Sequence, residues 1–187
     1  MPLLMLKDLP RFDALIRAAE RCPALQPSAC DAYLNLLRTG DDVFSVVSHF
    51  LAGHEIGQGR FTVLMLLGMG CQERPATPAT PATPATPATP ATLAEQAGVT
   101  RATMTGLIDT LEKDLLVARE PDPNDRRTIQ VRLTDAGRAL LDDVLPDYFQ
   151  CMADILRPLS EDERKKLVRL LQKIQAGLPE VHTGTPR

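Results

Sequence analysis

Six consecutive Pro-Ala-Thr triplets, from Pro75 to Thr92, interrupt this chain of 187 residues. A proline at every third position removes backbone N–H donors and pushes the preceding residue away from the α-helical region. The tract is therefore predicted to be exposed, extended chain of polyproline character, and neither helix nor strand. It could be a linker between two domains or an expanded loop within one. The flanks favour the loop, because segment 61–69 is too short and apolar to end a domain and the segment from Leu93 is too small to stand alone.

The sequence before the tract has the apolar periodicity of α-helices. Helices are predicted over 8–21 and 28–51, with Ser28 capping the second and Gly40 marking a break or bend in it. Segment 61–69 is apolar nearly all round and is predicted to be a short buried helix. Because aromatic residues make up only 4% of the chain, aliphatic side chains must fill the core, which suits helix packing better than a β-sandwich.

Cap and turn signals are clearest after the tract. Thr92 and Glu95 fit a capping box for a short helix that ends near Gln96. Gly98 can supply the positive φ of a tight turn, and Thr100 is predicted to cap the next helix. The apolar residues on one face of that helix are Met104, Leu107, Ile108 and Leu111.

Two short strands are predicted next. The first lies around 117–119, a turn covers 120–127, and apolar and polar residues alternate over 129–133 as in a half-buried strand. The order of helix, glycine turn, helix and β-hairpin is that of a helix-turn-helix with a wing. The predicted fold class is therefore mainly α with a small β-hairpin wing (α+β).

Two further helices are predicted at the C-terminal end. They cover 135–157, capped by Thr134 and kinked at Pro146, and 160–176, opened by a capping box in Ser160-Glu-Asp-Glu163. Like the helices before residue 58, they have more apolar surface than a small winged lobe can cover. We therefore expect them to bury it across a two-fold axis in a homodimer.

The second helix of the predicted helix-turn-helix has an outer face suited to DNA. The residues opposite the apolar stripe are Ala102, Thr105, Gly106 and Asp109, with Arg101 and Thr103 beside them. Small residues let a helix enter the major groove, and hydroxyls and arginine reach phosphates and base edges. The alternative is an ordinary polar surface.

The predicted wing is rich in arginine. Four arginines lie between Arg126 and Arg138 against one acid, Asp135, and the pair Arg126–Arg127 at the tip is suited to a narrow minor groove. The alternative is a solvated charged turn. The net charge of −3 is weak evidence against DNA binding, because the local distribution of charge matters more than the sum.

Segment 93–138 closely resembles the MarR (multiple antibiotic resistance regulator) family of winged helix-turn-helix regulators. The family pattern D-x-R, five residues, then L-T is met by Asp125, Arg127, Leu133 and Thr134, and GRFTVLMLL at 59–67 matches the helix that precedes the family's helix-turn-helix. The resemblance implies a dimer built from the terminal helices, with the recognition helix in the major groove and the wing in the minor groove. Two departures are the inserted repeat tract and Asp114, which stands where a glycine usually follows the recognition helix, so that strain is expected there.

The resemblance also implies which residues bind DNA and effector. The residues expected at the major groove are Thr100, Arg101, Thr103 and Thr105. Arg127, beside Arg126, is expected in the minor groove, with Asp125 orienting it. Family pockets lie between the dimer helices and the DNA-binding lobe and often take phenolic or aromatic acids. That location points to His49, Phe50, His54, Phe61 and Met65, although each is also compatible with an ordinary place in the core.

The expected organisation is N-terminal dimerisation helices over 1–58, a DNA-binding lobe over 59–134 with the repeat loop at 75–92, and C-terminal dimerisation helices and tail over 135–187. The expected function is a ligand-responsive repressor that binds a pseudo-palindromic operator in double-stranded DNA as a homodimer. The alternative is a winged-helix module that binds protein instead.

Other function classes find little support in the sequence. The three histidines accompany no recognisable nucleophile, and the four cysteines form no CxxC pair, so neither an enzyme nor a metal or cofactor site is expected. The cysteine usage suits a reducing cytoplasm, and no apolar run is long enough to cross a membrane.

Overall fold

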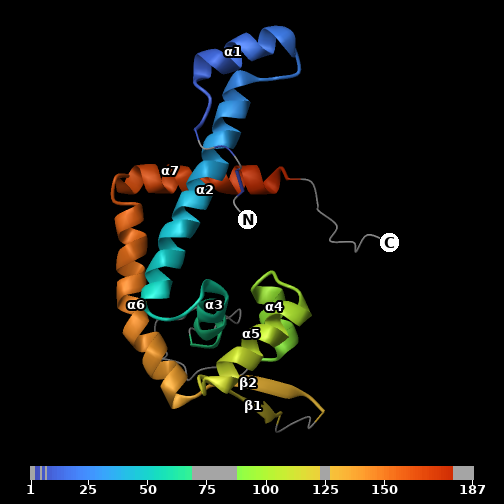
Figure 1. Ribbon diagram of the computed structural model, residues 1–187, viewed down its shortest axis with the longest axis vertical. Coiled ribbons are helices and arrows are strands. Elements are labelled where there is room, and N and C mark those ends of the chain that lie inside the picture. The colour runs from blue at the N-terminus through green and yellow to red at the C-terminus, as the bar shows by residue number, and fades with distance from the viewer. Residues whose placement is uncertain (1–2, 5, 7, 69–87, 123–126, 179–187) are drawn as a thin grey trace. The chain divides into compact units, whose positions relative to one another are not determined.

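The computed structural model describes residues 3, 4, 6, 8–68, 88–122 and 127–178 (Figure 1). The elements within these residues are α1 (Phe12–Arg21), α2 (Pro27–Gly53), α3 (Gln58–Gly68), α4 (Pro90–Gln96), α5 (Arg101–Lys113), β1 (Val117–Pro121), β2 (Ile129–Leu133), α6 (Asp135–Ile155) and α7 (Glu161–Ala176). The chain divides into two compact units, Met1–Tyr148 and Phe149–Arg187. The mainly helical fold with one β-hairpin is as expected.

The core of the larger unit lies where α3, α4 and α5 meet the hairpin of β1 and β2 (Figure 1). The large side chains that are fully buried in these elements include Leu64, Leu67, Leu93, Met104, Ile108, Leu111, Val117 and Val131. Each such side chain contributes about 1.5–3 kcal/mol by leaving water. The predicted stripe on α5 is therefore the face that packs inward, and the opposite face stays exposed.

The helix-turn-helix is formed by α4, a tight turn and α5. Gly98 has a φ of +64°, the left-handed conformation that favours glycine, and a side chain there would meet no atom within 4 Å. The glycine is therefore required by the backbone conformation of the turn, as expected, and not by close packing of the two helices.

The wing is an antiparallel pair in which Val117 lies opposite Leu133 and Arg119 opposite Val131. Ala88 pairs with Val131 on the edge of β2 that faces away from β1. Its N–H donates to Val131 O at 3.1 Å, and its carbonyl accepts from Val131 N–H at 2.8 Å. The end of the repeat tract therefore adds a single bridge to the outer edge of β2.

The structure corrects the expectation that the whole repeat tract avoids helix and strand. Helix α4 begins at Pro90, and Thr89 is its N-cap, with its hydroxyl oxygen accepting from Thr92 N–H at 3.1 Å. The capping box predicted at Thr92 is therefore wrong by one turn. Proline is tolerated at the first helical position because the N–H there has no partner within the helix. The rest of the predicted loop, 75–87, lies outside the described residues.

Two N-terminal predictions are corrected for related reasons. Helix α2 begins at Pro27, so Ser28 is not its cap, and it continues without a break through Gly40 to Gly53. Helix α1 begins at Phe12, four residues later than predicted, after Pro10. Prolines thus mark where these helices start.

The segment before α1 is attached to α2 by Asp41. Its carboxylate accepts hydrogen bonds from the N–H groups of Leu3 and Leu4, at 2.6 and 2.8 Å. The N–H of Leu3 is the largest cause of a lowered pKa at Asp41. Arg38, one turn earlier, donates to the carbonyl of Leu6. Gly40, Asp41 and Asp42, where a break or bend was predicted, therefore lie within the helix, and Asp41 binds the N-terminal segment to it.

Backbone strain was expected at Asp114, but the structure places it at the next residue, Leu115. Asp114 has a φ of −85°, whereas Leu115 has a φ of +59°. The N–H groups of Leu115 and Leu116 bond the carbonyls of Glu112 and Leu111, the pattern of a Schellman cap. The residue that occupies the position favouring glycine is therefore Leu115.

Helix α6 remains helical through Pro146 and ends at Ile155, two residues before the predicted end. In the smaller unit, α7 opens with the predicted capping box, in which Ser160 Oγ accepts from Glu163 N–H and Ser160 N–H donates to the Glu163 carboxylate. None of the described helices is long and apolar enough to cross a membrane.

Candidate nucleic-acid interface

The first turn of α5 carries three of the four residues expected at the major groove. Thr100 is the N-cap, and its hydroxyl oxygen accepts from Thr103 N–H at 3.1 Å while the two hydroxyls lie 2.9 Å apart. Arg101 is exposed beside them. Uncompensated N–H groups at a helix start favour anions, so this turn can receive a phosphate. Thr100 therefore has a structural role in capping besides any contact with DNA.

The next turn of α5 presents small side chains. Thr105 is exposed, and its hydroxyl donates to Arg101 O at 2.9 Å, which leaves its oxygen able to accept a further hydrogen bond. Ala102 and Gly106 are exposed on the same side, and a side chain at Gly106 would meet no atom within 4 Å. This face has the slim profile that lets a helix enter the major groove.

Two carboxylates follow on α5, and both are paired with an arginine of the wing. Arg119 of β1 donates to Asp109 at 2.6 Å and to Glu112 at 2.5 Å. Partial burial lowers the pKa of Arg119, but its hydrogen bonds to the two carboxylates outweigh this effect, so the net shift is upward. The outward position of Asp109 was predicted from the sequence, but its pairing with Arg119 was not; the signal was the pair of acids three residues apart on the predicted recognition helix.

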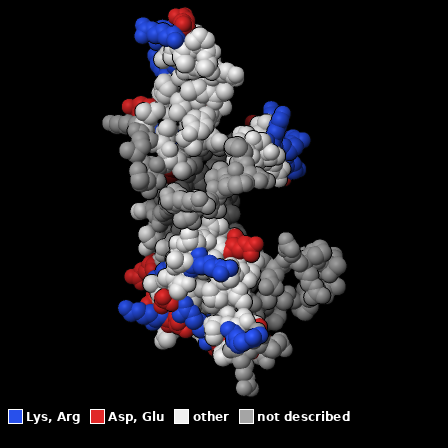
Figure 2. Space-filling view, turned by 90° about the vertical axis from the view of Figure 1, so that its right-hand side faces the viewer, with Lys and Arg blue, Asp and Glu red and all other residues white. Residues whose placement is uncertain are grey.

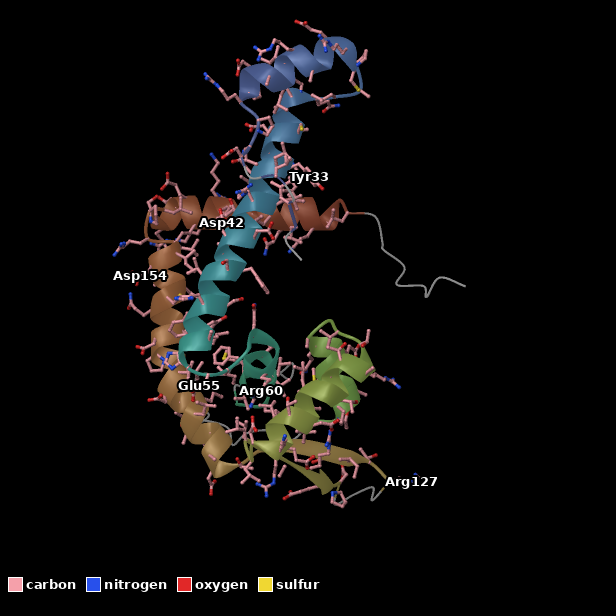
Figure 3. The ribbon with its side chains drawn as sticks, in the orientation of Figure 1. Tyr33, Asp42, Glu55, Arg60, Arg127 and Asp154 are labelled. Carbon is pink, nitrogen blue, oxygen red and sulfur yellow. The ribbon has the colours of Figure 1, made fainter. Side chains whose placement is uncertain are left out.

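The wing carries further charges. Arg132 of β2 donates to Glu120 of β1 at 2.5 Å, and this hydrogen bond lowers the pKa of Glu120. Arg127 is exposed at the outer end of the hairpin (Figure 3). Asp125 and Arg126, which were also predicted to act at the tip, lie outside the described residues. The structure thus places one predicted wing residue at a position that can reach beyond the lobe.

Positive charge on the larger unit is local. On the face shown in Figure 2, acidic and basic side chains of the described residues are interspersed at the level of the wing and form no uniform basic surface there. This distribution agrees with the net charge of −3. Among the described residues of α5 and the wing, positive charge is therefore supplied by individual exposed side chains, such as Arg101 and Arg127.

Three of the five residues expected in an effector pocket belong to one aromatic cluster. The rings of Phe50 and His54 lie 4.8 Å apart, and Tyr148 of α6 lies 6.3 Å from Phe50 and 4.8 Å from Phe61. Tyr148 was not predicted from the sequence to belong to this group, because the fold brings it in from a distant segment. The other two predicted residues are His49, which is exposed on α2, and Met65, which is half-buried on α3. Among the described residues, no group of His, Cys, Asp and Glu side chains is placed to hold a metal ion.

Comparisons with known proteins agree with this geometry. A model of the MarR family matches residues 84–129. The HTH-type transcriptional repressor YetL of Bacillus subtilis (strain 168) is 30% identical over 166 residues, which cover 89% of this chain and 92% of that protein.

Solved structures share the fold. Mutant MarR from Escherichia coli in complex with operator DNA has a TM-score of 0.62 at 22% identity, covering 86% of this chain and 97% of its own. CouR from Rhodococcus jostii RHA1 bound to p-coumaroyl-CoA has a TM-score of 0.60 at 23% identity, covering 80% and 94%. The helix-turn-helix, the wing and the full-length similarity to a repressor place this chain in the MarR family, as a winged helix-turn-helix DNA-binding regulator of transcription.

Proposed function

We propose that this protein is a repressor that binds a pseudo-palindromic operator as a homodimer, with α5 of each protomer in the major groove and the wing in the adjacent minor groove. The observation that carries the proposal is the exposed face of α5, where Arg101, Thr103 and Thr105 surround small residues. At the wing, Arg127 is proposed to enter the minor groove, with Asp125 and Arg126 beside it. The similarity to the YetL repressor supports repression.

Exposed apolar side chains support a dimer. In the larger unit they include Phe12, Ile16, Tyr33, Leu36, Phe44 and Val46, on α1 and α2. In the smaller unit they include Phe149, Met152, Leu167, Val168, Leu170 and Ile174, on α6 and α7. Apolar surface of this extent marks an interaction site, and a second copy of the chain is the occupant that symmetry favours. The division into dimerisation segments 1–58 and 135–187 around a DNA-binding lobe over 59–134 follows from this proposal.

An aromatic or phenolic effector is the proposed ligand. In the cluster, the half-buried side chains of Phe50, His54 and Tyr148 combine aromatic rings, a hydroxyl and an imidazole, the mixture that recognises an aromatic ring bearing a polar group, while Phe61 is buried behind Tyr148. The structurally similar CouR binds p-coumaroyl-CoA, which contains such a ring. His49 and Met65 are proposed as outlying members of the same site. The protein acts in this proposal by binding alone, without catalysis, and in the cytoplasm, where an operator is accessible.

The experiment that tests this function is selection from a pool of random-sequence duplexes. We expect the protein to enrich an inverted repeat whose half-sites are about one helical turn apart. Arg101→Ala should weaken binding to the selected duplex by about 1–3 kcal/mol. The matched control is Arg17→Ala, which removes an exposed arginine paired with Asp13 on α1 and should not weaken binding while light scattering shows that the variant still forms the dimer. Failure to enrich any sequence would overturn the proposal and favour a protein-binding winged helix. Light scattering should show a dimer at micromolar concentration.

A further inference from the structure

Arg119 of β1 pairs with two acids of α5, the helix that is proposed to enter the major groove. Asp109 and Glu112 are three residues apart, so they lie on one side of α5, with side chains 57% and 41% exposed. Arg119 reaches both with separate guanidinium nitrogens, and its own side chain is only 26% exposed. The charge on this part of the helix is therefore reduced from two negative charges to one.

The electrostatic consequence depends on the DNA. Each turn of the duplex carries a dense array of phosphates, and an unpaired carboxylate on a helix within the groove is repelled by them. Asp109 is on the exposed face of α5, one turn from Thr105. Arg119 reaches the two acids from β1, so that its positive charge lies next to them.

The mechanical consequence follows from where Arg119 is attached. It lies opposite Val131 in the hairpin, and Val131 is fully buried and also bridged to Ala88. Strand β1, which carries Arg119, begins with Val117, and this residue is 2% exposed. Apolar packing therefore fixes one end of β1 against the lobe, and the two hydrogen bonds of Arg119 fix its position along α5. A guanidinium is suited to bridging two carboxylates because its several N–H donors are held in a rigid plane.

We propose that Arg119 is a positioning residue for DNA recognition, which masks two carboxylates of the recognition helix and sets the wing relative to that helix without touching DNA itself. This inference rests on the proposed entry of α5 into the major groove. It differs from the family's recognition contacts because the arginine acts on the protein's own acids.

A mutant cycle on operator affinity tests the proposal. Arg119→Gln should weaken binding by about tenfold, because two unmasked carboxylates then face the phosphates. In the background of Asp109→Asn with Glu112→Gln, the same Arg119→Gln change should weaken binding by less than about threefold, since no acid remains to be masked. An equal loss in both backgrounds would mean that Arg119 contacts DNA directly, and no loss in either would remove its role; both results overturn the proposal.

Controls separate this role from folding and from the proposed function. Circular dichroism should show that each variant is folded, and Arg119→Lys provides a milder change that keeps the charge but replaces the rigid fork. We expect it to lose about threefold in affinity, and less when Glu112→Gln is also present. Arg132→Gln breaks a comparable 2.5 Å pair on the same hairpin but unmasks no acid on α5, so its loss should be smaller than that of Arg119→Gln. If Arg101→Ala has no effect, the groove contact itself fails; if only the cycle is uncoupled, the masking role fails alone.

Discussion

The hydroxyl of Thr134 donates a 2.6 Å hydrogen bond to the carbonyl of Leu115, joining the start of α6 to the end of α5. The same hydroxyl oxygen accepts from Gly137 N–H at 3.0 Å, so Thr134 also caps α6. A side chain at Gly137 would lie 1.9 Å from the carbonyl oxygen of Leu116, which shows how closely the two segments approach. The threonine of the L-T pattern thus holds the recognition helix in place relative to α6.

Leu115→Gly should stabilise the protein. Leu115 has a φ of +59° and the residue is 72% exposed, so the left-handed backbone costs about 1 kcal/mol with little packing in return. Removing this cost should raise the melting temperature by about 2–4 °C in calorimetry. Asp114→Gly is the matched control: Asp114 has a negative φ and an ion pair with Arg60, so glycine there should lower stability. Equal effects at the two positions would contradict this account of the turn.

Contraction of the repeat tract should be tolerated down to two triplets and not to one. Two triplets retain Ala88 for the bridge, Thr89 for the cap and Pro90 at the helix start. With one triplet, Glu73 and Arg74 of the present sequence take the places of Ala88 and Thr89, and loss of the cap should cost about 1 kcal/mol. Urea denaturation measures the difference between the two lengths.

The control for this contraction separates cap from length. In the one-triplet chain, changing the two residues before the remaining proline to Ala-Thr should restore the lost stability at unchanged length. If it does not, the shorter loop itself is strained and the cap is not the cause.

Prolines show where sequence reasoning succeeded and where it did not. Because Pro27 and Pro90 were expected to break helices, the helix starts were predicted after them, at Ser28 and Thr92. In the structure both prolines lie in the first turn of their helices. The periodicity of α5 and the alternation in β2 were sufficient to place those elements, because burial on one face determines both patterns. Contacts between distant segments, such as Arg119 with Asp109 or Tyr148 with Phe61, leave no periodic signal along the chain.

Docking of the N-terminal segment should depend on the ionisation of Asp41. Its pKa is lowered chiefly by the hydrogen bond from Leu3 N–H, so the folded protein binds this proton less readily than the unfolded chain does. The stabilisation is therefore present above the ordinary aspartate pKa of about 3.9 and is lost as pH falls through the lower folded value. Hydrogen exchange at the Leu3 and Leu4 amides should accelerate in Asp41→Asn at neutral pH. Asp42→Asn, one residue along, should leave that exchange slow.

Gly106→Ala should separate stability from DNA binding. Glycine inside a helix costs about 0.5–1 kcal/mol relative to alanine, and the space around Gly106 is open, so alanine should raise the melting temperature. If α5 enters the groove with this face, the added methyl group occupies room that DNA needs, and operator affinity should fall. Fluorescence anisotropy with operator duplex measures the second effect. Higher stability with unchanged affinity would show that this face is an ordinary polar surface.

Arg127→Ala should weaken operator binding without unfolding the protein. Arg127 is exposed at the end of the wing, where a guanidinium in a narrow minor groove lies between two phosphate backbones. Its removal should cost about 1–3 kcal/mol of binding free energy per subunit and make the dependence of affinity on salt shallower, because fewer counterions are released.

Asp125→Ala distinguishes two roles for the acid that neighbours Arg127 in the sequence. On charge alone its loss should tighten binding, whereas an acid that orients Arg127 through a charge-assisted hydrogen bond should weaken binding when removed. Affinity measured against salt concentration for wild type and both variants, with circular dichroism as the folding control, decides between them: unchanged affinity of folded Arg127→Ala excludes the wing contact, and tighter binding by Asp125→Ala excludes the orienting role.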